Sequence, residues 1–529
     1  MEKLIKIKRA LISVSDKTGI VELAKELCGR KIELVSTGGS ASILRNAGFK
    51  VTEVSKLTGF PEMMDGRLKT LHPNVHGGLL ADRDEKSHVN AMEKYNVKEI
   101  DLLVVNLYPF AETVRAGADY AQCIENIDIG GPAMIRAAAK NFKYVATLVD
   151  IEDYEGLVNE LKMNNGCTSY SFRQKLSQNA FSLSAYYDAM ISNWMLDNIT
   201  DVKPRRFSIS AALSQDLRYG ENPHQNASFF LDEYLQGGIG ASNQIQGKKL
   251  SYNNINDTDA ALELVNEFPQ NDGAAAVIVK HANPCGVGVA DSLVEAYRSA
   301  YSCDKTSAFG GIVALNCIID EESAREIIKV FTEVVIAPDI TEGARKIFSS
   351  KSNLRLLITK KSPVHASSSK VINHIAGGYL LQDKDIETLS QNDLRVVTKR
   401  TPTGNEFQDM LFAWKVAKHV KSNAIVYAKD RCTVGIGAGQ MSRVDSCRIA
   451  AKKAEDMAKT QGLYEIPTRG SALASDAFFP FADGLEAAIE AGASSIIQPG
   501  GSIRDDEVIK VANDAGLAMI FTGMRHFKH

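Results

Sequence analysis

The chain has 529 residues, 24% of them charged, and a formal net charge of -3. A chain of this length holds roughly three or four domain-sized units with real hydrophobic cores. The near balance of charges argues against a nucleic-acid or membrane surface built on bulk charge. We therefore expect small-molecule partners, and neither nucleic acid nor a membrane.

Targeting and redox signals point the same way. The N-terminus is basic, but its short apolar run is soon followed by Asp16 and Lys17, unlike a signal peptide. No stretch is long and apolar enough to suggest a membrane span. The eight cysteines are scattered and none forms a Cys-x-x-Cys pair, which favours reduced thiols over a disulfide frame or a zinc cage. We expect a cytoplasmic protein without a metal site.

Apolar periodicity in the first part of the chain alternates between strand and helix. We predict strands over residues 10–14, 32–35, 102–107 and 145–149, and helices over residues 19–28, 40–47 and 132–140. Strands that alternate with helices form a parallel, wound α/β sheet, which we expect to extend to about residue 150. Helical segments then run to about residue 198, and the polar stretch 201–207 is predicted to be a linker.

Two strand-to-helix turns of this unit combine hydroxyls with glycine. The first is Ser13-Val-Ser-Asp-Lys-Thr-Gly19, and the second is Ser36-Thr-Gly-Gly-Ser40. Free N–H groups and the dipole at a helix N-terminus favour an anion such as phosphate. Each turn alone could be an ordinary helix cap, and Lys17 could be a solvated charge. Because wound sheets bind ligands at their strand ends, the two turns together predict one phosphate site.

Candidate acid–base residues lie farther along the same unit. The segment 67–73, Arg-Leu-Lys-Thr-Leu-His-Pro, has neither strand nor helix periodicity and is predicted to be a functional loop. His72 and His76 have the spacing of a helical metal pair, but Pro73 and the following glycine pair argue against a helix. The residues that could form an acid–base cluster with an anion-stabilising lysine are Lys69, Tyr108, Asp128 and Lys140.

A second candidate site follows a β-branched run at 277–279, which ends on adjacent Lys280 and His281. We predict a strand that delivers a proton-transfer pair to a loop, with the segment 283–288, Asn-Pro-Cys-Gly-Val-Gly, supplying the turn. Adjacent residues point to opposite faces of a strand, so both can serve one site only where the strand ends. The alternative is a chance Lys-His pair at an ordinary edge. Cys285 is expected to be a packing residue.

The second part of the chain contains a repeat with an offset of 149 residues, the difference between 429 and 280. Lys280 is followed six residues later by Gly-Val-Gly, and Lys429 is followed six residues later by Gly-Ile-Gly. A second motif follows in each copy, at 307–310 and at 475–478. We predict two related α/β halves over residues 208–529, with a chance match of short glycine motifs as the alternative. Asp430 replaces the histidine, so the halves are expected to divide their work.

Unusual strings of residues appear in order along almost the whole chain. Besides the turn at 13, they are Gly-Phe-Pro-Glu-Met-Met-Asp-Gly-Arg at 59, Ile-Asp-Ile-Gly-Gly-Pro at 127, Arg-Tyr-Gly-Glu-Asn-Pro-His-Gln at 218, Ser-Tyr-Asn-Asn-Ile-Asn-Asp at 251, Lys-His-Ala-Asn-Pro-Cys-Gly at 280, Lys-Ser-Asn-Ala at 421, Ser-Asp-Ala-Phe-Phe-Pro-Phe at 475 and Arg-His-Phe-Lys-His at the end. The chain closely resembles the bifunctional purine-biosynthesis family that joins an inosine monophosphate (IMP) cyclohydrolase to a 5-aminoimidazole-4-carboxamide ribonucleotide (AICAR) formyltransferase.

The resemblance implies two sequential reactions. In the C-terminal region the amine of AICAR attacks the formyl group of the co-substrate 10-formyltetrahydrofolate, giving formamido-AICAR and tetrahydrofolate. That amine is a poor nucleophile, so the step needs proton removal and carbonyl activation. In the N-terminal unit the carboxamide nitrogen then attacks the formyl carbon and water leaves, which gives IMP. An amide nitrogen is weaker still, so this step depends on a near-attack geometry.

The resemblance also implies roles for residues. His281 is the implied general base, Lys280 assists the oxyanion or the leaving folate nitrogen, and cyclisation is implied for Lys69, Tyr108, Asp128 and Lys140. The residues implied in binding the nucleotide in the N-terminal unit are Ser15, Lys17, Thr18, Ser36, Gly38, Gly39, Ser40, Arg67, Thr70, Ile129, Gly130 and Asn141. Those implied around nucleotide and folate in the C-terminal region are Arg218, Tyr219, Asn283, Phe309, Gly310, Asn423, Arg443, Asp476, Phe478 and Arg525. The family usually has Thr at the position of Ser40, and the hydroxyl is kept.

The fold implied by the resemblance is α/β throughout. A methylglyoxal-synthase-like domain with a wound parallel sheet, the IMP cyclohydrolase domain, is expected over residues 1–199. A duplicated cytidine-deaminase-like α/β region, the AICAR formyltransferase domain, is expected over residues 200–529, with halves of about 208–365 and 366–529. The resemblance further implies a homodimer with shared formyltransferase sites and no catalytic metal, and it leaves a structural monovalent cation open.

Three other functions can be argued from parts of the sequence. A zinc nucleoside deaminase would explain Pro284-Cys285, but no second cysteine follows and no His-x-Glu precedes. A dinucleotide dehydrogenase would explain Gly435-x-Gly437, but Gln440 stands where the third glycine belongs. A nucleotide-sensing N-terminal domain would need phosphate binders, but it has no reason to keep Lys69, Tyr108 and Lys140 together.

Overall fold

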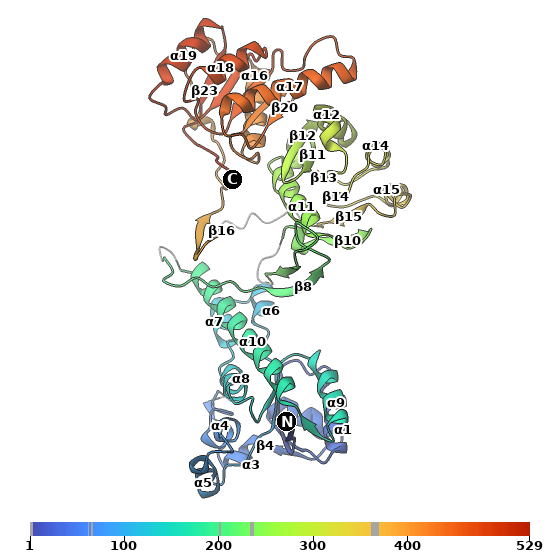
Figure 1. Ribbon diagram of the computed structural model, residues 1–529, viewed down its shortest axis with the longest axis vertical. Coiled ribbons are helices and arrows are strands. Elements are labelled where there is room, and N and C mark those ends of the chain that lie inside the picture. The colour runs from blue at the N-terminus through green and yellow to red at the C-terminus, as the bar shows by residue number, and fades with distance from the viewer. Residues whose placement is uncertain (1–3, 62, 65–66, 200–202, 233–236, 361–369) are drawn as a thin grey trace. The chain divides into compact units, whose positions relative to one another are not determined.

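The computed structural model describes residues 4–61, 63–64, 67–199, 203–232, 237–360 and 370–529 (Figure 1). Contacts divide these residues into two compact units. Unit 1 comprises the described residues up to Ala212 together with Asp232, and unit 2 comprises Leu213–Leu231 and the described residues from 237 onward. Of the predicted linker, residues 203–207 are exposed and without regular structure, while 201–202 lie outside the described residues.

Unit 1 is built on a five-stranded sheet with the order β4-β3-β2-β5-β6, and every neighbouring pair of strands is parallel. The strands are β2 (Arg9–Ser13), β3 (Glu33–Ser36), β4 (Val51–Glu53), β5 (Leu102–Val105) and β6 (Ala146–Leu148), with β1 (Ile5–Lys6) and β7 (Cys167–Thr168) as a separate antiparallel pair. The parallel wound sheet predicted from the strand and helix periodicity is therefore confirmed.

Helices cover both faces of this sheet. They are α1 (Ile20–Gly29), α2 (Gly38–Asn46), α3 (Val54–Thr58), α4 (Pro73–Leu80), α5 (Lys86–Lys94), α6 (Phe110–Arg115), α7 (Tyr120–Glu125), α8 (Gly130–Lys140), α9 (Asp153–Met163) and α10 (Tyr170–Asp197). Apolar residues of α1 and α9 form the core on one face, and those of α4, α8 and α10 form the core on the other. Figure 1 shows α8 beside α10 within this unit.

The expectation that residues 73–78 are not helical is wrong. Pro73 is the first residue of α4, where its missing N–H costs nothing, and His72 caps the helix by accepting the Asn74 N–H on Nδ1. Gly78 is needed for packing, since a Cβ there would collide with the backbone carbonyl of Lys98. His72 thus caps the start of α4. His76 lies within the helix, where burial lowers the pKa of its imidazole.

Unit 2 is built on a twelve-stranded mixed sheet. In spatial order its strands are β10 (Asn243–Gln246), β15 (Arg355–Ile358), β14 (Val334–Ala337), β13 (Ile312–Leu315), β11 (Ala274–Lys280), β12 (Asn283–Ala290), β20 (Cys432–Gly437), β19 (Ile425–Lys429), β21 (Ala472–Ser475), β22 (Ser495–Gln498), β23 (Ala518–Phe521) and β18 (Arg395–Val396). Two antiparallel ribbons stand apart from it, β8 (Ala212–Leu217) with β9 (Ala227–Leu231), and β16 (Lys370–Ile375) with β17 (Gly378–Asp383).

The helices of unit 2 lie on both faces of the sheet. They are α11 (Tyr252–Val265), α12 (Leu293–Cys303), α13 (Lys305–Ala308), α14 (Glu321–Ile327), α15 (Glu342–Phe348), α16 (Gly404–Ala417), α17 (Arg443–Gln461), α18 (Asp483–Glu490) and α19 (Asp505–Asp514), with short 3-10 turns η2 (Ile239–Ala241), η3 (Gln270–Asp272) and η4 (Gln391–Asp393). Helices α11 and α16 share one hydrophobic core, while α12 and α17 belong to separate cores.

The two halves of the large sheet have the same order of elements. Apart from the short α13 and the 3-10 turn η3 of the first half, α11 is followed by β11, β12, α12, β13, α14, β14, α15 and β15, and α16 is followed by β19, β20, α17, β21, α18, β22, α19 and β23. In each half a hairpin with one bulge pairs with a run of parallel strands. The halves meet where Gly288 of β12 pairs with Cys432 of β20. The expected boundary near residue 365 lies outside the described residues.

The turn after Lys280 differs from the one predicted. Asn-Pro-Cys-Gly-Val-Gly is not a loop but the first part of β12, and the chain reverses at His281 and Ala282, whose φ angles are +53° and +55°. Pro284 is tolerated in the strand because the register shifts beside it. Gly286 and Gly288 are packing glycines, since a Cβ on either would collide with backbone carbonyls of α12, those of Ala300 and Ala296.

Candidate functional site

The predicted phosphate site of unit 1 lies where the neighbouring parallel strands β2 and β3 end. Ser13 Oγ and Thr37 Oγ1, one from each turn, are 3.0 Å apart. Ser40 Oγ accepts a hydrogen bond from the Val14 N–H at 3.2 Å and donates one to the Val14 carbonyl at 3.0 Å. These hydrogen bonds join the two glycine-containing turns into one continuous surface at the carboxyl edge of the sheet.

Two lysine side chains lie over the N-terminus of α2. A Cβ on Gly38 would collide with Lys69 Nζ, and a Cβ on Gly39 would lie 3.6 Å from Lys17 Cε. Lys17 Nζ donates to the Ser15 carbonyl at 2.8 Å, which holds it there, and the N-cap residue Thr37 makes no side-chain hydrogen bond to the helix. Helix N–H groups next to two ammonium groups form a site for an anion.

The predicted hydroxyl ligands of this site differ in what they can reach. Ser36 is fully buried and donates to the Ile12 carbonyl at 2.7 Å, and Ser40 is committed to Val14. These two hydroxyls shape the turns and do not face a ligand, which corrects the binding role expected for them. Thr18 Oγ1 donates to Asp16 Oδ1 at 2.7 Å at the exposed rim of the first turn.

Asp128 is the best-defined member of the acid–base cluster. Burial raises the pKa of its carboxyl, although backbone N–H groups of Gly131, Tyr108 and Gly130 oppose the shift. The Gly131 bond is 2.8 Å long, and the Tyr187 hydroxyl lies 3.0 Å from the Asp128 backbone N. The carboxyl therefore links the end of the β5 segment, at half-exposed Tyr108, to the start of α8.

Lys69 and Thr70 connect this carboxyl to the anion site. Thr70 is buried, and a Cβ on Gly130 would lie only 2.7 Å from its Oγ1, so the loop packs on the start of α8. The preceding residue Lys69 reaches α2, as described above. The same edge of the sheet thus carries Lys69, Tyr108 and Asp128, three of the residues predicted to form one site.

Other predicted residues of unit 1 lie elsewhere. Lys140 is the exposed last residue of α8, about 15 Å from its first residue at 1.5 Å per residue, so it is not part of the Asp128 cluster. Asn141 donates to the carbonyls of Leu79 and Ala81 at 2.7 and 3.0 Å, which ties α8 to α4. Arg67 forms an exposed ion pair with Glu125, and Ile129 is the exposed N-cap residue of α8.

In unit 2 the Lys280–His281 pair lies at the tip of the β11–β12 hairpin. Lys280 Nζ donates to the Phe309 carbonyl at 2.8 Å, while His281 is exposed. Because β11 is antiparallel to β13, the end of β11 lies at the edge where β13 begins. The pair therefore lies next to Phe309 and Gly310, which lie just before β13 and which the family resemblance places around the nucleotide and folate.

A carboxylate from another element holds the hairpin tip. Asp257 of α11 accepts the N–H groups of His281 and Ala282 at 3.0 and 2.9 Å. The second half repeats this arrangement, with Asp409 of α16 accepting the N–H groups of Asp430 and Arg431 at 3.0 and 2.7 Å. Each carboxylate accepts two consecutive N–H groups of a turn with positive φ angles. Residues other than glycine adopt such angles only where neighbouring groups hold the backbone in place.

Asn283 joins the hairpin tip to the second half of unit 2. Its Nδ2 donates to the His281 carbonyl at 3.2 Å, and its Oδ1 accepts the Lys421 N–H at 3.1 Å. Asn423 follows two residues later and bonds through Nδ2 to the Gln440 carbonyl at 2.9 Å. The structure therefore brings His281, Asn283 and Asn423 into one neighbourhood.

Arg443 lies behind Asn423 and is buried. Its guanidinium donates to Asn423 Oδ1 at 2.8 Å and to Ser475 Oγ at 2.8 Å, and it is paired with the fully buried Asp476. These groups occupy only part of the donor set of a guanidinium, but the side chain is buried, so Arg443 orients Asn423 and is not exposed to a phosphate or a glutamate carboxylate. The same burial keeps Asp476 from a ligand, and these two expected binding roles become roles in positioning.

The remaining predicted residues of unit 2 lie on loops. Arg218 stacks over the ring of Tyr219 at 5.6 Å, in the loop between β8 and β9. Asn253 of α11 donates to the Glu221 carbonyl at 3.4 Å, one helical turn before Asp257, which sets this loop near the hairpin tip. Phe478 is half-buried, and exposed Arg525 lies over Phe527.

Three residues with clear roles in this geometry were not singled out from the sequence. Asp257 lies in the Ser-Tyr-Asn-Asn-Ile-Asn-Asp string, whose density of polar residues at a helix start was the available signal. Asn106 accepts the N–H groups of Ser15 and Asp16, and Phe331 packs on Phe309 with ring centroids 5.3 Å apart. Phe331 carried no sequence signal.

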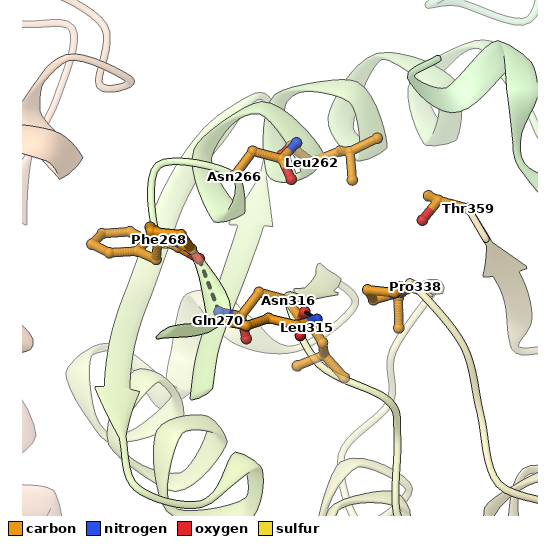
Figure 2. Close-up of a pocket in the computed structure, with 10 residues that line it drawn as sticks. Leu262, Asn266, Phe268, Gln270, Leu315, Asn316, Pro338 and Thr359 are labelled. Atoms are coloured by element: carbon orange, nitrogen blue, oxygen red, sulfur yellow. Dashed lines mark hydrogen bonds between the residues drawn. The ribbon is translucent and has the colours of Figure 1, made fainter. Parts of the chain in front are cut away.

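The pocket in Figure 2 lies at the other edge of the same sheet, where β13, β14 and β15 end. Its volume is about 220 Å³. Its central amide, Asn316, already donates to the carbonyls of Phe268 and Gly273 and accepts the Ala275 N–H. This amide is thus used by the fold, and the pocket is separate from Lys280.

No group of three or more potential metal ligands occurs among the residues that the structure describes. In the same residues, none of the helices is both long and apolar enough to cross a membrane.

Two family models match parts of this chain, and curated relatives match it over its whole length. A family model described as the AICARFT/IMPCHase bienzyme matches residues 138–453, and a model of the MGS-like domain matches residues 19–133. The bifunctional purine biosynthesis proteins PurH of Dinoroseobacter shibae and Ruegeria pomeroyi are 60% and 59% identical over 529 residues, which is 100% of each chain. A solved structure titled "Crystal structure of ForH" is 34% identical and covers 36% of this chain and 99% of its own, with a TM-score of 0.32. The chain therefore belongs to the AICARFT/IMPCHase bienzyme family of bifunctional purine biosynthesis proteins.

Proposed function

We propose that this chain carries out two consecutive steps of purine synthesis, formyl transfer to AICAR in unit 2 and ring closure to IMP in unit 1. The observation that carries this proposal is that each unit has its own cluster of reactive groups. Unit 1 combines an anion site with the partly buried Asp128 carboxyl, and unit 2 presents Lys280 and His281 at a hairpin tip that is held by Asp257. Two clusters in two units suit a family described as a bienzyme.

For formyl transfer, we propose that His281 takes a proton from the AICAR amine as its nitrogen attacks the formyl carbon of 10-formyltetrahydrofolate. The carbonyl π-electrons move to oxygen, and Lys280 stabilises that oxyanion. Collapse of the intermediate breaks the bond to the folate nitrogen, which gains a proton and leaves as tetrahydrofolate. Lys280 Nζ already donates to the Phe309 carbonyl, which fixes the ammonium group at the strand end.

For ring closure, the 5'-phosphate of formamido-AICAR binds at the turns of β2 and β3, beside Lys17 and Lys69. The carboxamide nitrogen attacks the formyl carbon, and the formyl oxygen departs as water after two proton transfers. Asp128 is placed to exchange these protons, because a carboxyl with a raised pKa takes up a proton more readily than an ordinary aspartate. Tyr108 and Lys69 complete the set around Asp128, and Lys140 lies at the other end of α8.

Several finer features belong to the same proposal. The cyclohydrolase domain spans residues 1–199 and the formyltransferase domain 200–529, and the matching order α-β-β-α-β in the two halves of unit 2 supports a duplicated cytidine-deaminase-like region. The protein forms a homodimer with shared formyltransferase sites, uses no catalytic metal and acts in the cytoplasm. A structural monovalent cation remains an open part of the proposal.

The test is direct. The purified chain is incubated with AICAR and 10-formyltetrahydrofolate, and tetrahydrofolate and IMP are followed together. Formation of both at matching rates is the expected result. Folded protein that gives neither product contradicts the proposal, and one that gives tetrahydrofolate but no IMP contradicts the role of unit 1.

A further inference from the structure

The C-terminal segment that follows β23 lies against the elements that hold Asn423. The His526 N–H donates to the Asp476 carbonyl at 3.1 Å. Ser422 is bonded to the segment twice, since its N–H donates to the Lys528 carbonyl at 2.8 Å and its Oγ accepts the Lys528 N–H at 3.2 Å. Ser422 directly precedes Asn423, and Asp476 pairs with the arginine that orients it. The last residues of the chain therefore lie beside the proposed site of formyl transfer.

Within this segment the side chain of His526 is anchored inward. It is only 2% exposed, while its neighbours Arg525 and Phe527 are exposed and lie against each other, with the guanidinium 4.4 Å from the ring centroid. The imidazole packs on Trp414 of α16, with ring centroids 5.2 Å apart, and its Nδ1 lies 2.5 Å from Asp385 Oδ2. The buried ring thus fixes the point of the chain from which Arg525 projects.

The partner of this imidazole is a charged carboxylate. Burial raises the pKa of Asp385, but the hydrogen bond and charge of His526 and the charge of Lys418 outweigh burial and hold that pKa below its ordinary value. The carboxylate therefore accepts the Nδ1 hydrogen, which satisfies a donor that the fold has buried. Since a hydrogen bond to a charged group is roughly twice as strong as one between neutral groups, this contact is a firm anchor for the segment.

The carboxylate is itself held by the helices of unit 2. Asp385 lies in the segment after β17, between two residues that contact those helices. Lys384 Nζ pairs with Glu263 of α11 at 2.5 Å, and Lys418, at the end of α16, donates to the Glu387 carbonyl at 3.2 Å. The position of the carboxylate is therefore set by α11 and α16 and not by the C-terminal segment that it anchors.

We propose that Asp385 is a positioning residue for formyl transfer, because it anchors His526 and thereby sets the place of Arg525 at the ligand. The inference rests on the proposed formyl transfer and on the place around nucleotide and folate that the family resemblance gives Arg525. A guanidinium pairs with a phosphate such as that of AICAR through two parallel hydrogen bonds. Without the anchor the segment keeps its backbone hydrogen bonds but no longer fixes this side chain. Substrate binding then weakens, while the groups that transfer protons stay in place.

The first test is Asp385→Ala in the full chain, assayed for transfer from 10-formyltetrahydrofolate to AICAR. We expect KM for AICAR to rise about ten-fold with little change in kcat, as for the loss of a charged hydrogen bond in binding. Asp383→Ala is the matched control. It removes an exposed carboxylate two residues earlier, whose partner is Lys370 of the β16–β17 ribbon, and it should leave KM unchanged.

Two further comparisons separate positioning from a loss of stability. His526→Asn keeps a donor near the position of Nδ1 and should retain the low KM, whereas His526→Leu should repeat the effect of Asp385→Ala. In an Arg525→Ala background the positioned group is absent, so Asp385→Ala should raise KM no further.

The outcomes distinguish this inference from the proposed function. An unchanged KM in folded Asp385→Ala protein, an unchanged KM in Arg525→Ala, or an equal rise caused by Asp385→Ala with and without Arg525 overturns the inference while formyl transfer stands. If Asp385→Ala does not fold, the His526 variants decide, and equal KM values for Asn and Leu at that position overturn it. Absence of transfer by the unmodified chain overturns the proposed function itself.

Discussion

At the residue scale, the position of His281 depends on a carboxylate that binds the protein backbone and has no proposed contact with the substrate. Asp257 accepts two consecutive backbone N–H groups of the hairpin tip, and the positive φ angles of His281 and Ala282 require such support. A catalytic base loses rate steeply when its ring is displaced by even 1 Å. We therefore assign Asp257 a positioning role.

Replacing Asp257 by Asn removes the charge and one of the two acceptors. We expect kcat for formyl transfer to fall about 10- to 100-fold with little change in KM for AICAR, because the base is displaced while binding groups remain. Cyclisation of supplied formamido-AICAR should be unchanged. Steady-state kinetics of both reactions, with the pH profile of kcat for the transfer, provide the measurement.

Asp409→Asn is the matched control for this variant. It makes the same change, loss of the charge and of one acceptor, at the equivalent turn that carries Asp430, so it should cost similar stability, about 1–3 kcal/mol, and spare formyl transfer. Equal loss of transfer in both variants would show that Asp257 acts only through stability.

A second residue-scale prediction concerns Asp128 and pH. Its carboxyl has a raised pKa in the folded chain, so its contribution favours folding below the ordinary value of 3.8 and is lost as pH rises through the folded pKa. Asp128→Asn cannot ionise and should lack this loss. Denaturant unfolding between pH 4 and pH 7, followed by Trp194 fluorescence in a Trp414→Phe background, measures unit 1. Parallel pH dependence in both proteins would contradict the assignment.

At the element scale, the sheet of unit 2 is shaped by close packing of its hairpins on helices. Gly286 and Gly288 bring β12 against α12, and Gly435 and Gly437 bring β20 against α17, with backbone carbonyls where a Cβ would project. These contacts explain why a sequence rich in glycine forms strands here and not loops. They also set the hairpin tips that carry Lys280 and Lys429.

Gly286→Ala should therefore destabilise unit 2 by about 3 kcal/mol, because its methyl group meets the fixed Ala300 carbonyl of α12. Gly404→Ala is the control, since a Cβ there meets no atom within 4 Å and alanine favours the first turn of α16. Urea unfolding, followed by Trp414 fluorescence in a Trp194→Phe background, compares them. Equal midpoints for the two variants would refute the packing role.

At the scale of the whole molecule, local periodicity and short strings predicted much of the fold. The strands of unit 1 and the repeat at 280 and 429 follow from side-chain patterns within a few residues. The twelve-stranded sheet could not be predicted, because the pairing of Gly288 with Cys432 joins residues far apart in sequence. The helix at 73–80 was missed because Pro73 and Gly78 were taken as breakers, although one starts the helix and the other packs it.

The candidate sites were predictable to a similar extent. Residues proposed to carry chemistry, such as Asp128 and His281, stand in strings that the family resemblance makes recognisable. Whether the other predicted side chains face a ligand depends on their burial, which the sequence does not report for a polar residue. Arg443, Asp476 and Ser36 are buried among internal partners. Lys140 lies at the far end of its helix, which also depends on the fold. Asp257 was not predicted because its contacts are with backbone N–H groups, which a sequence pattern does not show.

The central claim is that two separate sites catalyse the two reactions, and reciprocal variants test it most directly. Formyl transfer and cyclisation of supplied formamido-AICAR are each measured for His281→Ala and Lys69→Ala. We expect His281→Ala to abolish transfer and keep cyclisation, and Lys69→Ala to keep transfer and abolish cyclisation. Equal loss of both reactions in either folded variant would contradict it.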